Sequence, residues 1–405
     1  MQTAVARGAL IPLSRDGSTD VPLVPRSATP LRFLPLLASL LLAACAVTEE
    51  PAGPSPAETF ALVDRLMPPR TPDRAAWATD IQASFAALGL APTADNFCAV
   101  IAVTEQESTF QAQPAVPGLS KIAWKEIEGR AARLRIPAAV VRGALERVAS
   151  PDGRSYAARI DTVRTERELS DIFEDMIGAV PMGRTLFGRW NPVRTGGPMQ
   201  VSIAFAEAHA SRQDYPWPIE RDIRGEVFSR RGGMYFGIAH LLDYPADYDR
   251  QLYRFADFNA GHHASRNAAF QHALALATGT KLALDGDLID HSAPASAPGS
   301  TERAARRLGG RLGLDDAAIR RALEQGDSLE FARTSLYQGV FRLADAKAGR
   351  ALPRARVPDI RLQSPKITRN LTTAWFADRV EQRYRRCLQR VPKGGATPRP
   401  SSAAA

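Results

Sequence analysis

Residues 103–110 read VTEQESTF, and this short segment decides how the rest of the chain is interpreted. It closes an expected helix whose apolar stripe passes through Val100 and Thr104 at helical spacing. Glu107 continues that stripe, and Pro114 soon prevents the helix from continuing. Partial burial and the partly negative C-terminus of a helix both disfavour a charged carboxylate. The position therefore predicts a glutamic acid suited to general-acid catalysis.

A second carboxylate stands two residues earlier, at Glu105. Two residues correspond to about 200° around a helix, so Glu105 is expected to point away from Glu107. It therefore cannot be the second carboxylate of a glycosidase pair, and Glu107 is expected to act alone.

The fold class expected from the rest of the chain is mainly α, because strand-like alternation is sparse. Residues 71–73 (TPD) predict a helix start, and Gly89 predicts the end of that helix. Asp95 or Asn96 is expected to cap the helix that carries Glu107. Further helices are expected at residues 119–134, 137–149, 165–177, 233–244, 252–277, 301–308, 315–324, 329–344 and 372–388.

Three segments in order resemble motifs of the soluble lytic transglycosylases. Residues 103–110 resemble the Q-E-S-x-F motif of that family, residues 197–202 (GPMQVS) its G-L-M-Q-L-M-P segment, and residues 257–261 (DFNAG) its A-Y-N-A-G segment. Residues 233–242 (GMYFGIAHLL) are similar to the helix that precedes the last motif. The layout also resembles an uncharacterised family of proteobacterial envelope lipoproteins.

The resemblance implies a lysozyme-like fold that cuts the MurNAc–GlcNAc linkage of peptidoglycan and forms a 1,6-anhydro sugar. Glu107 would first protonate the glycosidic oxygen and then accept the proton of the MurNAc C6 hydroxyl, with no second carboxylate required. The same resemblance implies that five further residues bind the substrate: Ser108, Met199, Gln200, Asn259 and Gly261.

Two departures from the family pattern support a different function. Phe258 stands where the family has a tyrosine, so a hydroxyl near the glutamate would have to come from Tyr235, Tyr244 or Tyr253. The Gln-Glu-Ser and Met-Gln segments also lie much farther apart than in the family. The alternative is a non-catalytic envelope lipoprotein that binds peptidoglycan or a protein partner on the same fold.

The N-terminal region predicts export and a lipid anchor. Arg26 and Arg32 precede the apolar run 33–44 (FLPLLASLLLAA), which ends directly on Cys45. That run is shorter than the roughly 20 residues that span a bilayer, and it has the features of a secretory signal. Residues 42–45 (LAAC) resemble the bacterial lipobox, which implies lipidation of Cys45 and, with alanine following it, a place on the periplasmic face of the outer membrane.

Composition changes along the chain predict its domain organisation. We expect a lipoprotein signal region at 1–45, a flexible tether at 46–56, a lysozyme-like domain at 57–290 with an insertion at about 115–190, a linker at 291–300, a C-terminal helical region at 301–390 and a disordered tail at 391–405.

Charge and cysteine content limit the partners and the redox state. The formal net charge of +9 suits anionic partners such as peptidoglycan or lipid headgroups, and export excludes nucleic acid. An oxidising compartment allows a disulfide between Cys98 and Cys387, while two unpaired buried thiols are the alternative.

No cofactor or metal is expected. The six histidines are scattered without a metal-binding motif and are interpreted as surface or loop residues. The acidic run at 285–290 lacks the spacing of a calcium-binding EF-hand loop. Among the tryptophans, Trp190 is the candidate for stacking on a sugar, because it lies shortly before Met199 and Gln200.

Overall fold

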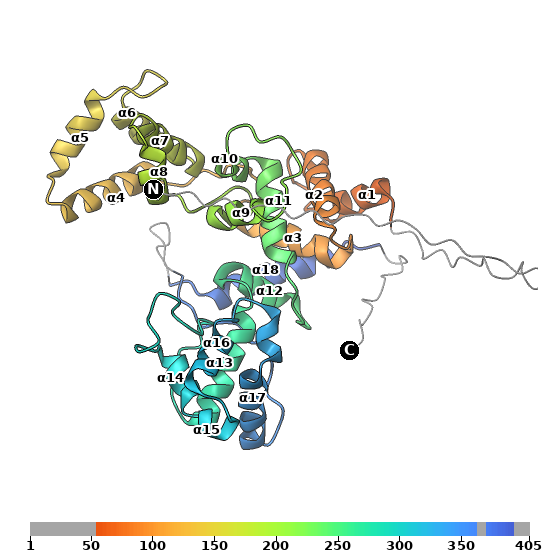
Figure 1. The fold of residues 1–405 in the computed structure, drawn as a ribbon. Coiled ribbons are helices and arrows are strands. Elements are labelled where there is room, and N and C mark those ends of the chain that lie inside the picture. The colour runs from red at the N-terminus through yellow and green to blue at the C-terminus, as the bar shows by residue number, and fades with distance from the viewer. Residues whose placement is uncertain (1–53, 363–369, 393–405) are drawn as a thin grey trace, which may run out of the picture. The chain divides into compact units, whose positions relative to one another are not determined.

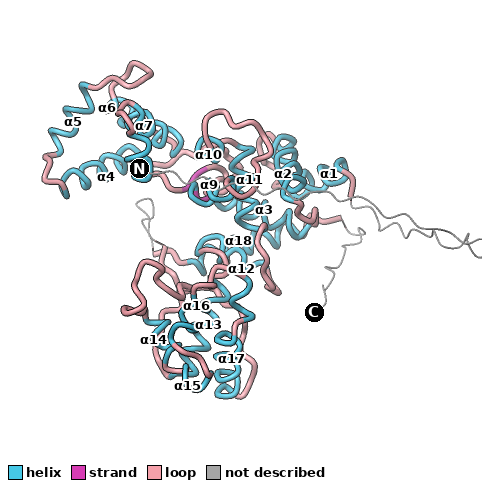
Figure 2. The backbone as a smooth tube through the Cα atoms, in the orientation of Figure 1, coloured by secondary structure: helices cyan, strands magenta, loops and turns pink. Residues whose placement is uncertain are grey.

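The computed structural model describes residues 54–362 and 370–392. The predicted signal region, Cys45, nearly all of the predicted tether and most of the predicted tail lie outside these residues. The described chain is mainly α-helical, as expected, and strands account for very little of it (Figures 1 and 2).

The helices run in the following order along the described residues: α1 Pro56–Leu66, α2 Arg74–Leu88, α3 Ala94–Glu107, α4 Leu119–Arg133, α5 Ala138–Arg147, α6 Tyr156–Thr162, α7 Glu166–Gly178, α8 Gly183–Phe187, α9 Ile203–Ala210, α10 Ile223–Val227, α11 Arg230–Leu242, α12 Gln251–Ala260, α13 Ala264–Thr278, α14 Ser300–Arg306, α15 Gly309–Leu312, α16 Asp316–Leu323, α17 Ser335–Ala348 and α18 Thr373–Leu388. Two 3₁₀ helices are η1 Gly188–Trp190 and η2 Leu329–Arg333. Strand β1 Thr195–Gly196 pairs antiparallel with β2 Val201–Ser202.

Local sequence explains several of these boundaries and corrects others. Gly89 ends α2 with a φ of 63°, as predicted. Thr93, rather than Asp95 or Asn96, caps α3, because its hydroxyl accepts the backbone N–H of Asn96 at 3.2 Å. The serine-capped helix α6 was not predicted.

The single helix expected at residues 252–277 is wrong. The chain forms α12 and α13 there, and the break contains Gly261 with a φ of 108° and His263 with a φ of 61°. A residue with positive φ cannot continue a right-handed helix, and glycine adopts this conformation without a Cβ clash. The apolar pattern concealed the break, because α12 buries one face and α13 is buried on almost every side up to Leu274.

The largest core is built from helices at both ends of the described chain. α1, α2, α3, α11, α12 and α18 contribute to it, with Val63, Ile81, Phe97, Phe255 and Val380 completely buried. α18 packs against both α3 and α12. α18 thus completes the same core as the helix that carries Glu107, although the rest of the predicted C-terminal helical region does not.

A second core joins α13 to the helices that follow it. α14, α16 and α17 pack with α13 around Phe270, Phe331 and Phe341. Glu302 is completely buried in this part of the chain, where it pairs with Arg306 at 2.6 Å and Arg320 at 3.2 Å. α14 and α17 therefore pack on α13, α16 packs on α14, and α15 packs on α17, whereas α18 packs on α3 and α12.

The predicted insertion has a core of its own. α4, α6 and α7 pack around Leu119, Trp124, Tyr156, Ile160 and Ile172. α5 contributes no fully buried residue. Another small core, formed by the β hairpin with α9, α10 and α11, connects the insertion to α11.

Candidate functional site at the end of helix α3

Glu107 is the last residue of α3, and its side chain is half-buried. This confirms its predicted place in the final turn. Ser108 follows as the C-cap and is buried, with its backbone N–H and its Oγ both donating to Thr104 O at 3.1 Å. Ser108 therefore completes the end of the helix, and Phe110 then packs edge-on against Trp77.

Two arginines of α18 lie against this helix end. Arg383 Nε is 3.7 Å from Glu105 Oε1, and Arg386 Nη2 is also 3.7 Å from the same oxygen. Burial lowers the pKa of Arg383, and its attraction to Glu105 and Glu107 acts in the opposite direction. That Glu105 points about 200° away from Glu107 around α3 stays a prediction, and the charge of Arg383 is attracted to both carboxylates.

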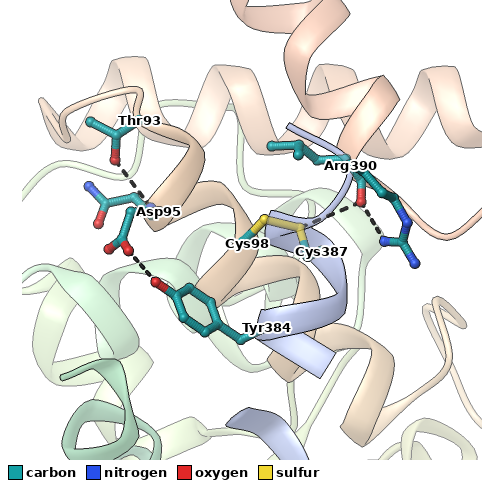
Figure 3. Close-up of a disulfide and its surroundings, with 8 residues drawn as sticks. Thr93, Asp95, Cys98, Tyr384, Cys387 and Arg390 are labelled. Carbon is teal, nitrogen blue, oxygen red and sulfur yellow. Dashed lines mark hydrogen bonds between the residues drawn. A yellow bond between two sulfur atoms is a disulfide. The ribbon is translucent and has the colours of Figure 1, made fainter. Parts of the chain in front are cut away.

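A disulfide holds α18 in this position. Cys98 of α3 is bonded to Cys387 of α18, which selects the disulfide over the two unpaired thiols (Figure 3). Close by, the Tyr384 hydroxyl donates to Asp95 of α3. The Arg390 guanidinium donates to Leu66 O at 2.8 Å, which ties the end of α18 to α1. The arginines of α18 are therefore fixed over the end of α3.

The third resembling segment also meets α18. Asn259 is exposed near the end of α12, and its Oδ1 accepts the Thr373 hydroxyl at 3.1 Å. Gly261 ends α12 with the positive φ described above. Phe258 packs against the largest core, and its carbonyl accepts His240 Nε2 at 3.2 Å. The segment that ends at Glu107 and the segment that contains Asn259 thus both contact α18.

Met199 and Gln200 differ in their surroundings. Met199 is fully buried and packs against Gly237 of α11, where a Cβ would lie 2.5 Å from Met199 Sδ. Gln200 is half-buried, and its Oε1 accepts the Thr195 hydroxyl at 3.3 Å while its Nε2 donates to Gly197 O. Met199 therefore belongs to the core, and Gln200 fixes the turn of the β hairpin.

Two of the three tyrosines that could replace the missing hydroxyl have other partners. Tyr235 OH lies 3.3 Å from His209 Nε2, and Tyr244 OH donates to Asp257 at 3.1 Å. Trp190 is 51% exposed and stacks obliquely on Phe187. Its carbonyl accepts Arg130 of α4, so Trp190 belongs to the insertion.

The interpretation of the histidines as surface or loop residues is wrong for His209 of α9 and His240 of α11, which are helical and shielded from water. His262 and His263 do lie in a loop, between α12 and α13. His240 stacks on His262 with 4.7 Å between the ring centroids, and Tyr244 also stacks on His262, with 4.0 Å between the centroids. Burial lowers the pKa of His240 and of His263 to about 3, and it also lowers the pKa of His209. These rings are therefore neutral at physiological pH, and the chain break after α12 brings them together.

Asp257, the first residue of the DFNAG segment, is a buried carboxylate that holds neighbouring segments together. It is completely buried and accepts hydrogen bonds from Tyr248 OH at 2.6 Å, Tyr244 OH at 3.1 Å and the Ser265 N–H at 2.6 Å. Burial raises its pKa. These bonds join α12 to the start of α13.

Within residues 54–362 and 370–392, no group of three or more histidine, cysteine, aspartate or glutamate side chains is placed to hold a metal ion. Across the same residues, none of the helices combines the length and the apolar character needed to cross a bilayer.

Comparison with known proteins places the chain in a family. The family model "Protein of unknown function (DUF1615)" matches residues 70–390, from before α2 to the end of α18. The chain belongs to the DUF1615 family. A curated relative, "Uncharacterized protein YaiW" of Escherichia coli (strain K12), is 56% identical over 364 residues, which cover 89% of this chain and 98% of the relative. No solved structure matches the chain. The region matched by the DUF1615 model includes both Glu107 on α3 and Arg383 on α18.

Proposed function

We propose that this DUF1615 protein binds the glycan strands of peptidoglycan without cleaving them. In this proposal a lysozyme-like arrangement of α2, α3, α11 and α12 is retained for recognition, and a lipid on Cys45 anchors the protein to the periplasmic face of the outer membrane. The ordered resemblance of three segments to lytic transglycosylases supports the choice of ligand.

The observation that carries the proposal is the position of Arg383, whose Nε lies 3.7 Å from Glu105 Oε1 and whose charge is also attracted to the Glu107 carboxylate. A guanidinium is attracted to an ionised carboxylate and has no such attraction to the carboxylic acid that must protonate a glycosidic oxygen. The phenylalanine at position 258 also removes the hydroxyl that bonds the glutamate in the transglycosylase pattern.

The surface beside Asn259 has the chemistry that glycan binding needs. Trp375 of α18 is 36% exposed, and it lies two residues after Thr373, the partner of Asn259. The Arg379 guanidinium lies 6.0 Å from the centre of the Trp375 ring. An exposed aromatic face packs against a sugar ring, and arginine attracts the carboxylates of muramic acid and the stem peptides.

Cosedimentation with purified sacculi tests the proposal, using a soluble form that starts after Cys45. Trp375→Ala is expected to weaken binding about tenfold, because loss of one stacked aromatic removes roughly 1.4 kcal/mol. Trp190→Ala is the matched control, since Trp190 is also an exposed aromatic but lies in the insertion. Failure of the wild type to sediment with sacculi would refute glycan binding.

A second candidate function is cleavage by a lytic transglycosylase mechanism. The observation in its favour is the retention of Gln106, Glu107 and Ser108 at the last turn of α3. Mass analysis of the soluble products separates the two functions. Release of 1,6-anhydro-muropeptides by the wild type, abolished in Glu107→Gln, would replace the binding proposal with the catalytic one.

A further inference from the structure

The insertion contains an apolar cavity that neither glycan binding nor glycan cleavage uses. Its volume is 650 Å³, and its walls come from α4, α5, α6, α7 and the segment before the β hairpin. Ligand sites in proteins commonly have volumes of about 300–1,000 Å³ and mainly apolar walls with a few polar groups. The size and position of this cavity are therefore those of a small-molecule site.

Large apolar side chains border the cavity, and three of them, Ile127, Leu145 and Leu169, also pack against the core of the insertion. Ile122 and Ile127 of α4, Val141 and Leu145 of α5, and Leu169 and Phe173 of α7 line it, and all six remain only half-buried. Incomplete burial of so many large apolar side chains forfeits stabilisation of about 25 cal/mol for each Å² left in water. An apolar ligand that fills the cavity would recover this stabilisation.

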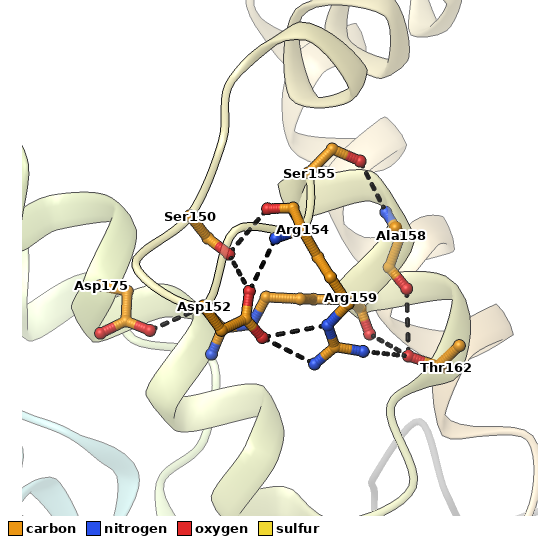
Figure 4. Close-up of polar contacts among 8 residues, drawn as sticks. All are labelled: Ser150, Asp152, Arg154, Ser155, Ala158, Arg159, Thr162 and Asp175. Atoms are coloured by element: carbon orange, nitrogen blue, oxygen red, sulfur yellow. Dashed lines mark hydrogen bonds and ion pairs between the residues drawn. The ribbon is translucent and has the colours of Figure 1, made fainter.

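Polar contacts outside the cavity hold its walls in place. Arg159 of α6 pairs with Asp175 of α7 at 2.6 Å, and Asp152 bonds Arg154 in the loop before α6 (Figure 4). The Arg142 guanidinium of α5 lies 3.9 Å from the centre of the Trp124 ring of α4. α5 is thus attached to α4 by this contact and not by fully buried side chains, so the space beneath α5 stays open.

Charged side chains that line the cavity indicate which charge a ligand would carry at its polar end. Glu126 is bonded to Arg130 at 2.7 Å, and Glu166 is buried and engaged in an interaction within the protein. Arg194 is the exposed charge among the lining residues, next to Thr195 of β1. An apolar chain inside the cavity would therefore end beside an accessible guanidinium, which favours an anionic head.

We propose that the cavity between α4, α5 and α7 binds a single acyl chain whose anionic end lies at Arg194. A free fatty acid and a lysophospholipid both present this chemistry, a linear apolar chain with a negative group at one end. The inference is independent of the glycan-binding proposal, because it concerns other residues and another ligand.

Titration calorimetry with alkanoates of increasing length tests the site. Each added methylene is expected to lower the Kd about fourfold until the cavity is filled, since burial of a CH₂ contributes about 0.8 kcal/mol. Arg194→Gln should weaken binding of dodecanoate severalfold and leave dodecanol unchanged. Parallel titration with dodecanoyl-lysophosphatidylglycerol supports the same site if it binds, and the ratio of the two affinities identifies the preferred head.

A cavity-filling variant localises the binding. Leu145→Trp places a larger side chain in the cavity and is expected to weaken dodecanoate binding at least tenfold, with the melting temperature unchanged or raised. Val140→Trp is the matched control, because Val140 is 59% exposed on the same helix and does not line the cavity. If Leu145→Trp fails to fold, Ala123→Leu on α4 serves the same purpose. Absence of saturable dodecanoate binding, or equal binding by the filled and control variants, would overturn the proposal.

Discussion

Arg383 of α18 lies 3.7 Å from the carboxylate of Glu105 on α3, although 278 positions separate the two residues in the chain. The Arg383 side chain is only 17% exposed and the Glu105 side chain 23%, so water screens this pair only in part. Replacement of Arg383 by methionine keeps most of the side-chain volume and removes the charge. We expect a loss of about 1–3 kcal/mol in the free energy of unfolding, measured by urea denaturation.

The matched control for Arg383→Met is Arg385→Met. Arg385 lies on the same helix, and its side chain is 65% exposed in its pair with Glu381. A pair this exposed contributes little, so the control should change stability by less than about 0.5 kcal/mol. Equal effects of the two substitutions would show that the contact of Arg383 with the end of α3 contributes nothing specific.

Replacement of Glu107 by glutamine tests the chemistry of the helix end. Under the binding proposal, products released from sacculi and the affinity for sacculi both stay unchanged, because glutamine keeps the size of the side chain. A transglycosylase would instead lose anhydro-muropeptide release by about 100- to 10,000-fold, the usual contribution of general acid–base catalysis. Liquid chromatography with mass detection distinguishes these outcomes.

The disulfide between Cys98 and Cys387 is expected to stabilise the fold by about 2–5 kcal/mol, since it closes a long loop of the unfolded chain. Dithiothreitol should therefore lower the melting temperature of the wild type. A Cys98→Ser, Cys387→Ser double variant should melt at that lower temperature with or without reductant. A wild-type melting curve insensitive to full reduction would contradict this prediction.

The buried histidines predict acid sensitivity. The folded protein holds His263 at a pKa of about 3, below the ordinary value of 6.5. The unfolded chain therefore binds more protons below pH 6.5, and the stability contributed by a neutral His263 is lost as the pH falls from about 6.5 toward 3. In His263→Gln, which cannot be protonated, the free energy of unfolding should fall less steeply over this range. Parallel curves for the variant and the wild type would exclude His263 as a source of acid sensitivity.

Cys45→Ala tests the anchor, because its thiol is the predicted lipid acceptor. The variant should accumulate as an unlipidated precursor and leave the detergent phase in Triton X-114 partitioning. Globomycin, which blocks removal of the signal segment, should leave the wild type as a precursor of the same length that still carries its lipid. A variant of mature size that remains in the detergent phase would disprove lipidation at Cys45.

Local patterns predicted helices well and predicted long-range contacts poorly. The end of α2 at Gly89 and the end of α3 at Glu107 follow from residues close by in the chain. The contact of Arg383 with Glu105 depends on a helix crossing that periodicity cannot specify. One signal was present: Glu105 lies two turns after Cys98, and Arg383 lies one turn before Cys387. If the disulfide is assumed, helical spacing brings these side chains near one another.

The histidine cluster escaped prediction for a related reason. It depends on the chain reversal at Gly261 and His263, which brings His262 against His240 of α11. The adjacent histidines at 262 and 263 diverge on an ideal helix, and only the break between α12 and α13 turns both inward. The burial of Met199 likewise follows from the glycine opposite it at position 237, which belongs to another helix.

The late position of α18 in the chain also sets when the protein can finish folding. Synthesis proceeds at about 5–20 residues per second, so the 289 positions from Cys98 to Cys387 take roughly 15–60 s to appear. During that time the face of α3 that α18 covers has no partner. The main core therefore cannot close until α18 has been made, an order of folding that would suit the export proposed for this protein.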